Sequence, residues 1–432
     1  MRRLSRLFGL LGGACTICIG QAAFAQNYDP FLDSEIPFDI SRGHNVSVVD
    51  RERPEYDPLG VRLASLLVYP SAQLGVGYST NVFGSANNPT SDAFFAFDPR
   101  LTVQSDWSRH AAGFHASGAF RRFAEATLKN ENGFSVGTDG RLDVGPSSYL
   151  NASIGGTRDY EAQYSGSFPQ NAARSVEYFR KNAMFRATYQ GARLKIIGST
   201  DITDFNFRDT QLLNGAVLDQ DFRDRTIYRG SGRVELALSP DTAGFVQATY
   251  SSIGYKRPLT TGGNRDGHEF RVLGGATLDL TALIRGSIGL GYVRRDYDSP
   301  AFKSFGGLSA DIRLQYFPSQ ITTVTLSAQR KIEDSILANS SGYFVNAVSL
   351  SVDHELLRNL LLNAEFDYQR NVFQTVTRRD QMFRVTGGAR YLINRSLTLS
   401  ANTTYFDRTS SGLPTGQQFD EWRGTLSLTI SL

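Results

Sequence analysis

Arginines are the residues of this chain whose type and spacing point most directly to chemistry. They recur at polar positions of short segments in which apolar and polar residues alternate, so they share one face of each segment. A guanidinium group pairs bidentately with a carboxylate or a sulfate, and rows of such groups on an inward face could pass an anionic solute or polymer. The predicted inward-facing set is Arg121, Arg180, Arg186, Arg225, Arg229, Arg233, Arg271, Arg285, Arg313, Arg384, Arg390 and Arg423.

The same arginines have a structural alternative, in which they neutralise acids on the same face of the wall. Seven acids occupy suitable positions: Asp139, Asp143, Glu235, Asp279, Asp311, Glu365 and Asp367. We expect most of the arginines to be paired in this way, so that only a subset near a constriction is free to select ions. The sequence leaves open which arginines form that subset.

Other chemistry finds little support in the sequence. The five histidines are scattered, and the adjacent Asp353 and His354 would point to opposite faces of a strand. Cys15 and Cys18 are the only cysteines, and both lie in an N-terminal leader. Because no phosphate-binding loop, dinucleotide fingerprint, zinc spacing or basic tail occurs, we expect no catalytic residues, no cofactor, no metal site and no nucleic-acid partner.

The elements that would position the arginines are predicted to be β-strands. Residues 63–91 carry no charge, but Pro70 and several polar residues interrupt them, and their apolar residues alternate with period 2 rather than 3.6. Residues 308–316, 360–368, 383–393 and 422–432 repeat the alternation. Tyr, Phe and Trp recur near the segment ends, as in the aromatic girdles of membrane barrels, so we predict an all-β transmembrane antiparallel β-barrel rather than a soluble sandwich.

The connections between these segments alternate between short and long. Eight short turns and nine longer polar loops make 17 connections, which predicts about 18 strands, with 16 as the alternative. Short turns face the periplasm in such barrels and long loops face the outside, so both ends of the barrel lie on the periplasmic side. The longest loops, 162–176 and 208–221, each have two interpretations: a constriction folded into the lumen or an external cap.

Composition and charge divide the chain into three parts. Residues 1–25 have a basic start, an apolar core and a small-x-small end, which predicts a signal peptide cleaved between Ala25 and Gln26. Residues 26–62 carry a net charge of −4 and four prolines, as in a flexible periplasmic lead or a small plug. Residues 63–432 form the predicted barrel, which would lie in the outer membrane of a Gram-negative cell in contact with lipid and lipopolysaccharide.

The chain resembles a family of bacterial outer-membrane barrels called putative β-barrel porin 2. The motifs that carry the resemblance are Pro58, Gly60-Val61-Arg62, Tyr69-Pro70-Ser71, Gly75-x-Gly77-Tyr78, Asn81-Val82-Phe83, Pro99-Arg100-Leu101, Ser105-Asp106-Trp107-Ser108-Arg109-His110 and Asp139-Gly140-Arg141. It implies a role in exopolysaccharide or capsule production, with polysaccharide and periplasmic export components as partners, and offers no catalytic residues. A general small-solute porin and a closed docking barrel are the alternatives.

Overall fold

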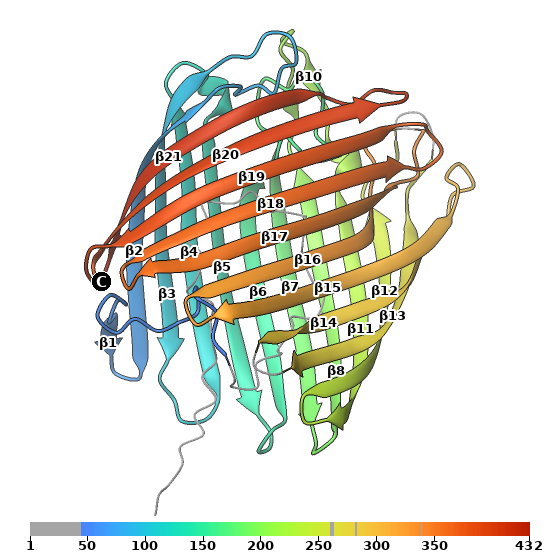
Figure 1. Cartoon of the computed structure of the whole chain (residues 1–432). Helices are drawn as coiled ribbons and strands as arrows, with labels where there is room; N and C mark the ends of the chain where they lie inside the picture. The colour runs from blue at the N-terminus through green and yellow to red at the C-terminus, as the bar shows by residue number, and fades with distance from the viewer. Residues whose placement is uncertain (1–44, 260–262, 281–282, 338) are drawn as a thin grey trace, which may run out of the picture.

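The computed structural model describes residues 45–259, 263–280, 283–337 and 339–432 (Figure 1). The predicted leader, its cleavage point at Ala25 and Gln26, and the first part of the acidic segment lie outside these residues. The wall of the first half is made of β2 (Leu66–Ser79), β3 (Asp92–Ser105), β4 (Ala111–Phe123), β5 (Glu131–Asp143), β6 (Tyr149–Tyr160), β7 (Glu177–Gln190), β8 (Leu194–Phe207), β11 (Arg225–Ser239) and β12 (Thr242–Tyr255). The second half is made of β13 (Gly267–Leu280), β14 (Ile284–Tyr297), β15 (Phe305–Ser319), β16 (Thr322–Glu333), β17 (Tyr343–Leu357), β18 (Leu360–Phe373), β19 (Arg379–Leu392), β20 (Leu397–Ser411) and β21 (Phe419–Ser431).

These eighteen strands close into one antiparallel barrel, as the sequence predicts. Each strand pairs with its neighbours in the chain, and β21 returns to β2, with Ser431 opposite Ser71 and Arg423 opposite Ser79. Closure satisfies the backbone hydrogen-bonding groups that a free edge would leave exposed to lipid. The predicted all-β fold and the count of 18 are confirmed.

Small elements decorate the barrel at its two ends. The short strand β1 (Val61–Leu63) pairs only with the start of β2, while β9 (Thr210–Gln211) pairs with β10 (Val217–Leu218) in a long loop. Two single 3₁₀ turns, η1 (Thr127–Lys129) and η2 (Asp221–Arg223), lie in other loops. No helix among the described residues is long and apolar enough to cross a membrane.

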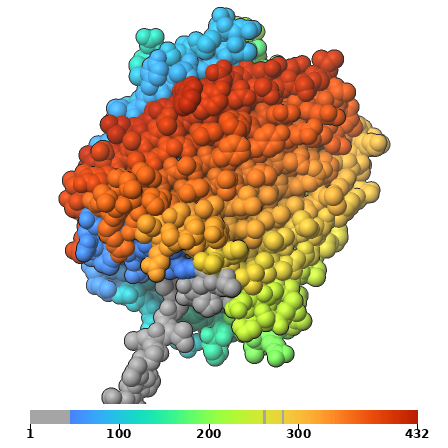
Figure 2. All heavy atoms as spheres, in the orientation of Figure 1, coloured from blue at the N-terminus to red at the C-terminus, as the bar shows by residue number. Residues whose placement is uncertain are grey.

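Alternation along each strand separates an apolar outer face from a polar inner one. On β12, Val246 and Tyr250 are exposed on the outside, whereas Gln247 and Thr249 between and beside them are buried on the inside. The outer surface over the C-terminal strands is a continuous wall (Figure 2). Because lipid replaces water at this wall, the exposed apolar side chains are the ones that the membrane covers.

The turns and loops lie where the sequence places them. Short turns gather at the end of the barrel that carries β1 and the C-terminus, and the longer loops lie at the opposite end (Figure 1). Residues 161–176, between β6 and β7, and 208–224, between β8 and β11, are among the longest connections. The inward side chains of the strands are therefore held on a rigid frame, with irregular backbone restricted to the ends.

Glycines in the wall differ in how much space surrounds them, and this gives a stability test. A Cβ added at Gly291 would overlap the backbone oxygen of Val272 on the adjacent strand, whereas one at Gly230 would meet no atom within 4 Å. We expect Gly291→Ala to destabilise the barrel by about 1–3 kcal/mol and Gly230→Ala to change stability by about 0.5 kcal/mol or less. The temperature at which the folded band disappears in heat-modifiability gels should fall for the first variant alone; equal temperatures would contradict the prediction.

Candidate functional site: the lumen

The loop of residues 161–176 folds into the lumen rather than capping the barrel from outside. Ala172 and Val176 have no exposed surface, and Phe168 is 2% exposed. An apolar cluster at the long-loop ends of β7 and β8 contains Phe168, Ala172 and Val176 together with Tyr178 and Phe207. The loop also reaches the connection after β2, where Gln163 Nε2 donates to the backbone oxygen of Val82 at 2.6 Å.

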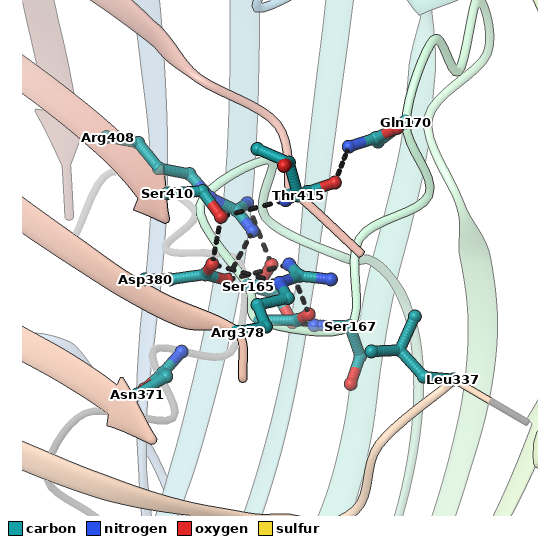
Figure 3. Close-up of polar contacts among 12 residues, drawn as sticks. Ser165, Ser167, Gln170, Leu337, Asn371, Arg378, Asp380, Arg408, Ser410 and Thr415 are labelled. Atoms are coloured by element: carbon teal, nitrogen blue, oxygen red, sulfur yellow. Dashed lines mark hydrogen bonds and ion pairs between the residues drawn. The ribbon is translucent and has the colours of Figure 1, made fainter. Parts of the chain in front are cut away.

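A buried ion network holds this loop, with members on β19, on β20 and at the residue before β19 (Figure 3). Arg408 donates through Nη1 to the backbone oxygens of Gln163 and Ser165, at 2.8 and 2.9 Å. Its Nη2 lies 3.1 Å from Asp380 Oδ2. Arg378 donates to both oxygens of Asp380, at 2.9 and 2.7 Å, and also approaches the backbone oxygen of Gly166 at 3.4 Å. We call Arg378, Asp380 and Arg408 the latch.

Further contacts fix the latch in place. Ser410 Oγ donates to Asp380 Oδ1 at 2.7 Å, and Ser167 Oγ donates to the backbone oxygen of Asp334 at 2.9 Å. Asp380 and Arg408 have no exposed side-chain surface. Since an unpaired charge at such a position costs several kcal/mol, the latch is stable only while its three charged members and the loop carbonyls stay together.

Breaking the latch should open the lumen. Asp380→Asn leaves two buried guanidinium groups without their shared carboxylate, a loss of about 3–5 kcal/mol for a buried network. We expect the loop to undock and the single-channel conductance in planar bilayers to rise at least twofold. Asp407→Asn is the matched control, because Asp407 precedes Arg408 on β20 and its side chain points to the opposite, outward face. Equal conductance in wild type and Asp380→Asn would show that the loop does not limit the pore.

Beside the loop, the lumen contains a cavity of 340 Å³ that is rich in positive charge. Eight basic and four acidic side chains line it, an excess of four positive charges. The basic residues are Arg180, Arg223, Arg225, Arg229, Arg265, Arg271, Arg295 and Lys331, and the acidic ones are Glu161, Glu269, Glu333 and Asp334. Aromatic rings of Tyr164, Tyr178, Phe205, Phe207, Tyr255 and Tyr343 share the lining. The cavity therefore suits an anion that also presents flat apolar surface.

Asp334, in the loop after β16, carries much of the compensating negative charge. It pairs with Arg295 and lies 3.2 Å from Arg225 Nε. Burial disfavours the ionised carboxyl, but the charges of Arg295, Arg225 and Arg265 outweigh burial and lower its pKa to about 2. Asp334 therefore stays ionised throughout the physiological range.

Four of the predicted arginines line the cavity: Arg180, Arg225, Arg229 and Arg271. They are not free of partners, since Arg229 lies 3.8 Å from Asp201 and Arg271 lies 3.8 Å from Asp311. The prediction omitted three further cavity arginines: Arg223, Arg265 and Arg295. The alternation of β14 places Arg295 on the inner face, whereas Arg223 and Arg265 lie in connections, where no periodicity signals their direction.

The other predicted arginines lie elsewhere on the inner wall, and most of them contact acids or amides. The nitrogen–oxygen distances are 3.7 Å for Arg121 and Glu131, 2.7 Å for Arg233 and Glu235, 2.8 Å for Arg384 and Asp367, 2.8 Å for Arg423 and Glu421, and 2.7 Å for Arg285 and Gln315. Arg186 and Arg390 are partly buried, with Asp201 and Asp353 as nearby acids. Arg313 is exposed to the lumen. Much of the predicted arginine set is therefore paired with acids or amides of the wall.

The periplasmic end of the lumen holds the described part of the acidic segment. Val48 N–H donates to Thr323 Oγ1 at 3.0 Å, and Arg53 lies 2.8 Å from Glu355 Oε2. Arg285 reaches down from β14 to the backbone oxygen of Asn45 at 2.7 Å. Val48 is 1% exposed and Arg53 is 3% exposed. Residues 45–57 therefore lie against the inner wall near the short turns, and both ends of the lumen carry a folded segment.

The charge of Asp334 gives a pH-dependent prediction. Its pKa is lowered on folding, so it contributes stability above its ordinary value of 3.8, and that contribution is lost as the pH falls through about 2. We expect Asp334→Asn to unfold at lower guanidinium concentration than wild type at pH 7 and at pH 5. Below pH 2 the two should coincide. Asp298→Asn, at an exposed loop carboxyl, is the control and should match wild type throughout. A difference that persists below pH 2 would contradict the prediction.

The closed barrel, its apolar exterior and its polar, partly filled lumen define a channel-type protein of the bacterial outer membrane. The sequence model of the family described as putative beta-barrel porin 2 matches residues 53–432, and the chain belongs to that family. The match covers the whole barrel together with the end of the acidic segment. The family match supports a barrel of the porin or transporter type. Barrels of this type are generally not enzymes.

The solved structures that are similar to this chain match it at low sequence identity and with TM-scores below 0.5. OpdL of Pseudomonas aeruginosa is 12% identical, with 86% of this chain and 99% of that chain covered and a TM-score of 0.44. The ferric-catecholate import receptor Fiu of E. coli K12 is 11% identical, with coverage of 87% and 82% and a TM-score of 0.44. The copper transporter OprC is 11% identical, with coverage of 86% and 81% and a TM-score of 0.46. No curated protein sequence matches the chain.

Proposed function

We propose that this protein is a gated outer-membrane conduit for anionic saccharides, with secreted acidic polysaccharide as its substrate. The observation that carries the proposal is the cavity beside the loop, where eight basic and four acidic side chains surround aromatic rings. Guanidinium groups pair with the carboxylates or sulfates of an acidic sugar, and aromatic faces pack against the apolar faces of sugar rings.

The two folded segments give this conduit a closed state. The loop of residues 161–176 covers the cavity at the long-loop end, and residues 45–57 cover the periplasmic end. An anionic polymer in the cavity would compete with Glu161, at the start of the loop, for Arg223, whose Nη1 lies 2.8 Å from Glu161 Oε2. Substrate binding and opening are then coupled through this guanidinium group.

Ion selectivity is the direct test of the basic lumen. Reversal potentials in planar bilayers, measured on Asp380→Asn to ensure an open pore, should show a preference for anions. Adding Arg180→Gln and Arg229→Gln should reduce the anion-to-cation permeability ratio severalfold, because these side chains line the cavity. Arg294→Gln is the control, since Arg294 lies on the outer face of β14 beside Asp296. A cation-selective open pore would refute the proposal.

The substrate class needs a cellular test. Deleting the gene should abolish surface polysaccharide without changing the uptake of small neutral solutes, and the wild-type gene should restore it. Restoration by the double Arg180→Gln and Arg229→Gln variant should be weaker than by Arg294→Gln at equal protein level. Unchanged surface polymer together with slower solute uptake would favour a general small-solute porin.

A closed docking barrel is the second candidate, and the filled lumen is the observation that favours it. Arg51 and Arg53 both pair with Glu355, at 3.2 and 2.8 Å, so the periplasmic segment is firmly held. A peptide of residues 26–62 should then capture periplasmic partners in a pull-down. Deleting residues 26–57 should leave an electrically silent barrel if docking is the function, and should raise conductance if the segment is a plug.

A further inference from the structure

The outer wall carries a groove that none of the lumen features explains. A depression of 460 Å³ runs over β4, β5, β6 and β7, and its surface is almost entirely apolar. Its lining includes Phe114, Phe134, Val136, Ile154 and Phe179, together with Lys181. Phe114, Phe134, Val136 and Ile154 are each at least 39% exposed, so these side chains form walls without closing the space between them.

A glycine produces the floor of this groove. On β6, Ile154 is exposed on the outside, and Gly156 follows two residues later on the same face. The register sets Gly156 between Val136 of β5 and Lys181 of β7. A Cβ added at Gly156 would meet no atom within 4 Å. The missing side chain therefore leaves open space at this point of the outer wall.

Positive charge lies at the long-loop end of the groove. Lys181 is exposed on the outer face of β7. Arg158 and Arg208 stack over Phe179, at 5.8 and 5.4 Å from the ring centre. Arg158 is paired with Glu177 at 2.6 Å. Lys181, Arg158 and Arg208 therefore form one outward-facing group, here called the rim.

The nearby acids do not cancel the charge of the rim. Asp204 lies opposite Lys181 in the register, but it accepts from Lys256 at 2.8 Å and from Thr226 Oγ1 at 2.8 Å. In these contacts four cations, Lys181, Arg158, Arg208 and Lys256, share two carboxylate partners, Asp204 and Glu177. The rim therefore retains a local positive excess on a surface that faces outward.

The height of the rim matches the polar boundary of the membrane. Asp204 pairs in register with Thr226, and one row further toward the short turns Ile202 pairs with Tyr228, which is 56% exposed. An ionic row directly above an outward tyrosine marks the membrane–water interface. The groove descends from this level toward the membrane centre, on the side of the long, external loops.

We propose that the groove and its rim form a binding site for lipopolysaccharide through its lipid A part. One acyl chain lies over Gly156 beside Val136 and Ile154, and a lipid A phosphate binds Lys181 with Arg158 and Arg208. The external leaflet is where this lipid resides, and only a ligand with both a phosphate and a saturated chain uses both features of the site. The site stands on the outer wall and is independent of what the lumen conducts.

Native mass spectrometry of the full-length detergent-solubilised protein tests the site. With lipid A bisphosphate as the probe, one lipid should remain bound per barrel after the loosely bound lipids are stripped. Gly156→Leu fills the groove and should reduce retention at least tenfold, and Lys181→Gln should reduce it severalfold. Gly230→Leu and Arg294→Gln are the matched controls, an open outward glycine and an outward arginine away from the groove, and should retain lipid as wild type does.

Two further probes separate the contributions of phosphate and lipid type. The wild type should retain dephosphorylated lipid A only weakly. This retention should be about the same as that of intact lipid A by the Lys181→Gln variant. Phosphatidylglycerol offers one phosphate and two chains, so equal retention of it would overturn the assignment to lipid A. Unchanged lipid A binding in both Gly156→Leu and Lys181→Gln would overturn the site itself. A wild-type dimer that Gly156→Leu dissociates would show that a second copy of the chain occupies the groove.

Discussion

The need to satisfy every backbone hydrogen bond inside a lipid bilayer is the constraint on which this structure depends. A lone strand edge in hydrocarbon leaves unpaired N–H and C=O groups that each cost several kcal/mol, so the sheet must close. Closure between β21 and β2 brings the last residues of the chain beside residues 71–79. It also fixes the inward or outward direction of every side chain, because a shift of one residue would exchange the two faces.

That fixed alternation explains which features of the structure could be predicted from the sequence alone. Val246 and Tyr250 outside, with Gln247 and Thr249 inside, show the pattern that predicted strand positions and the inner face. The count of turns and loops predicted the number of strands. The sequence could not predict which inward arginines meet, since that depends on neighbours far away in the chain. Arg408 and Gln163, for example, are separated by 245 residues. Arg223 and Arg265 stand in connections, where local periodicity carries no information on direction.

The closed wall also determines which charges inside the barrel are neutralised. A buried guanidinium needs a partner, and the wall supplies one for most: Arg233 has Glu235 and Arg384 has Asp367. An excess of basic groups therefore survives only where acids are fewer, as around the 340 Å³ cavity. The predicted pairing is thus found over much of the lumen, and the proposed ion selectivity would belong to the cavity.

The loop of residues 161–176 connects these parts, because different forces hold its two ends. Where Phe168, Ala172 and Val176 pack with Tyr178 and Phe207, burial of apolar surface holds it independently of charge. At the latch its carbonyl oxygens accept hydrogen bonds from the buried guanidinium groups of Arg378 and Arg408. Loss of the charged contacts would free the 163–166 end while the apolar end stays anchored. Under the proposed gating, the loop would swing aside about its apolar end and return to the same position.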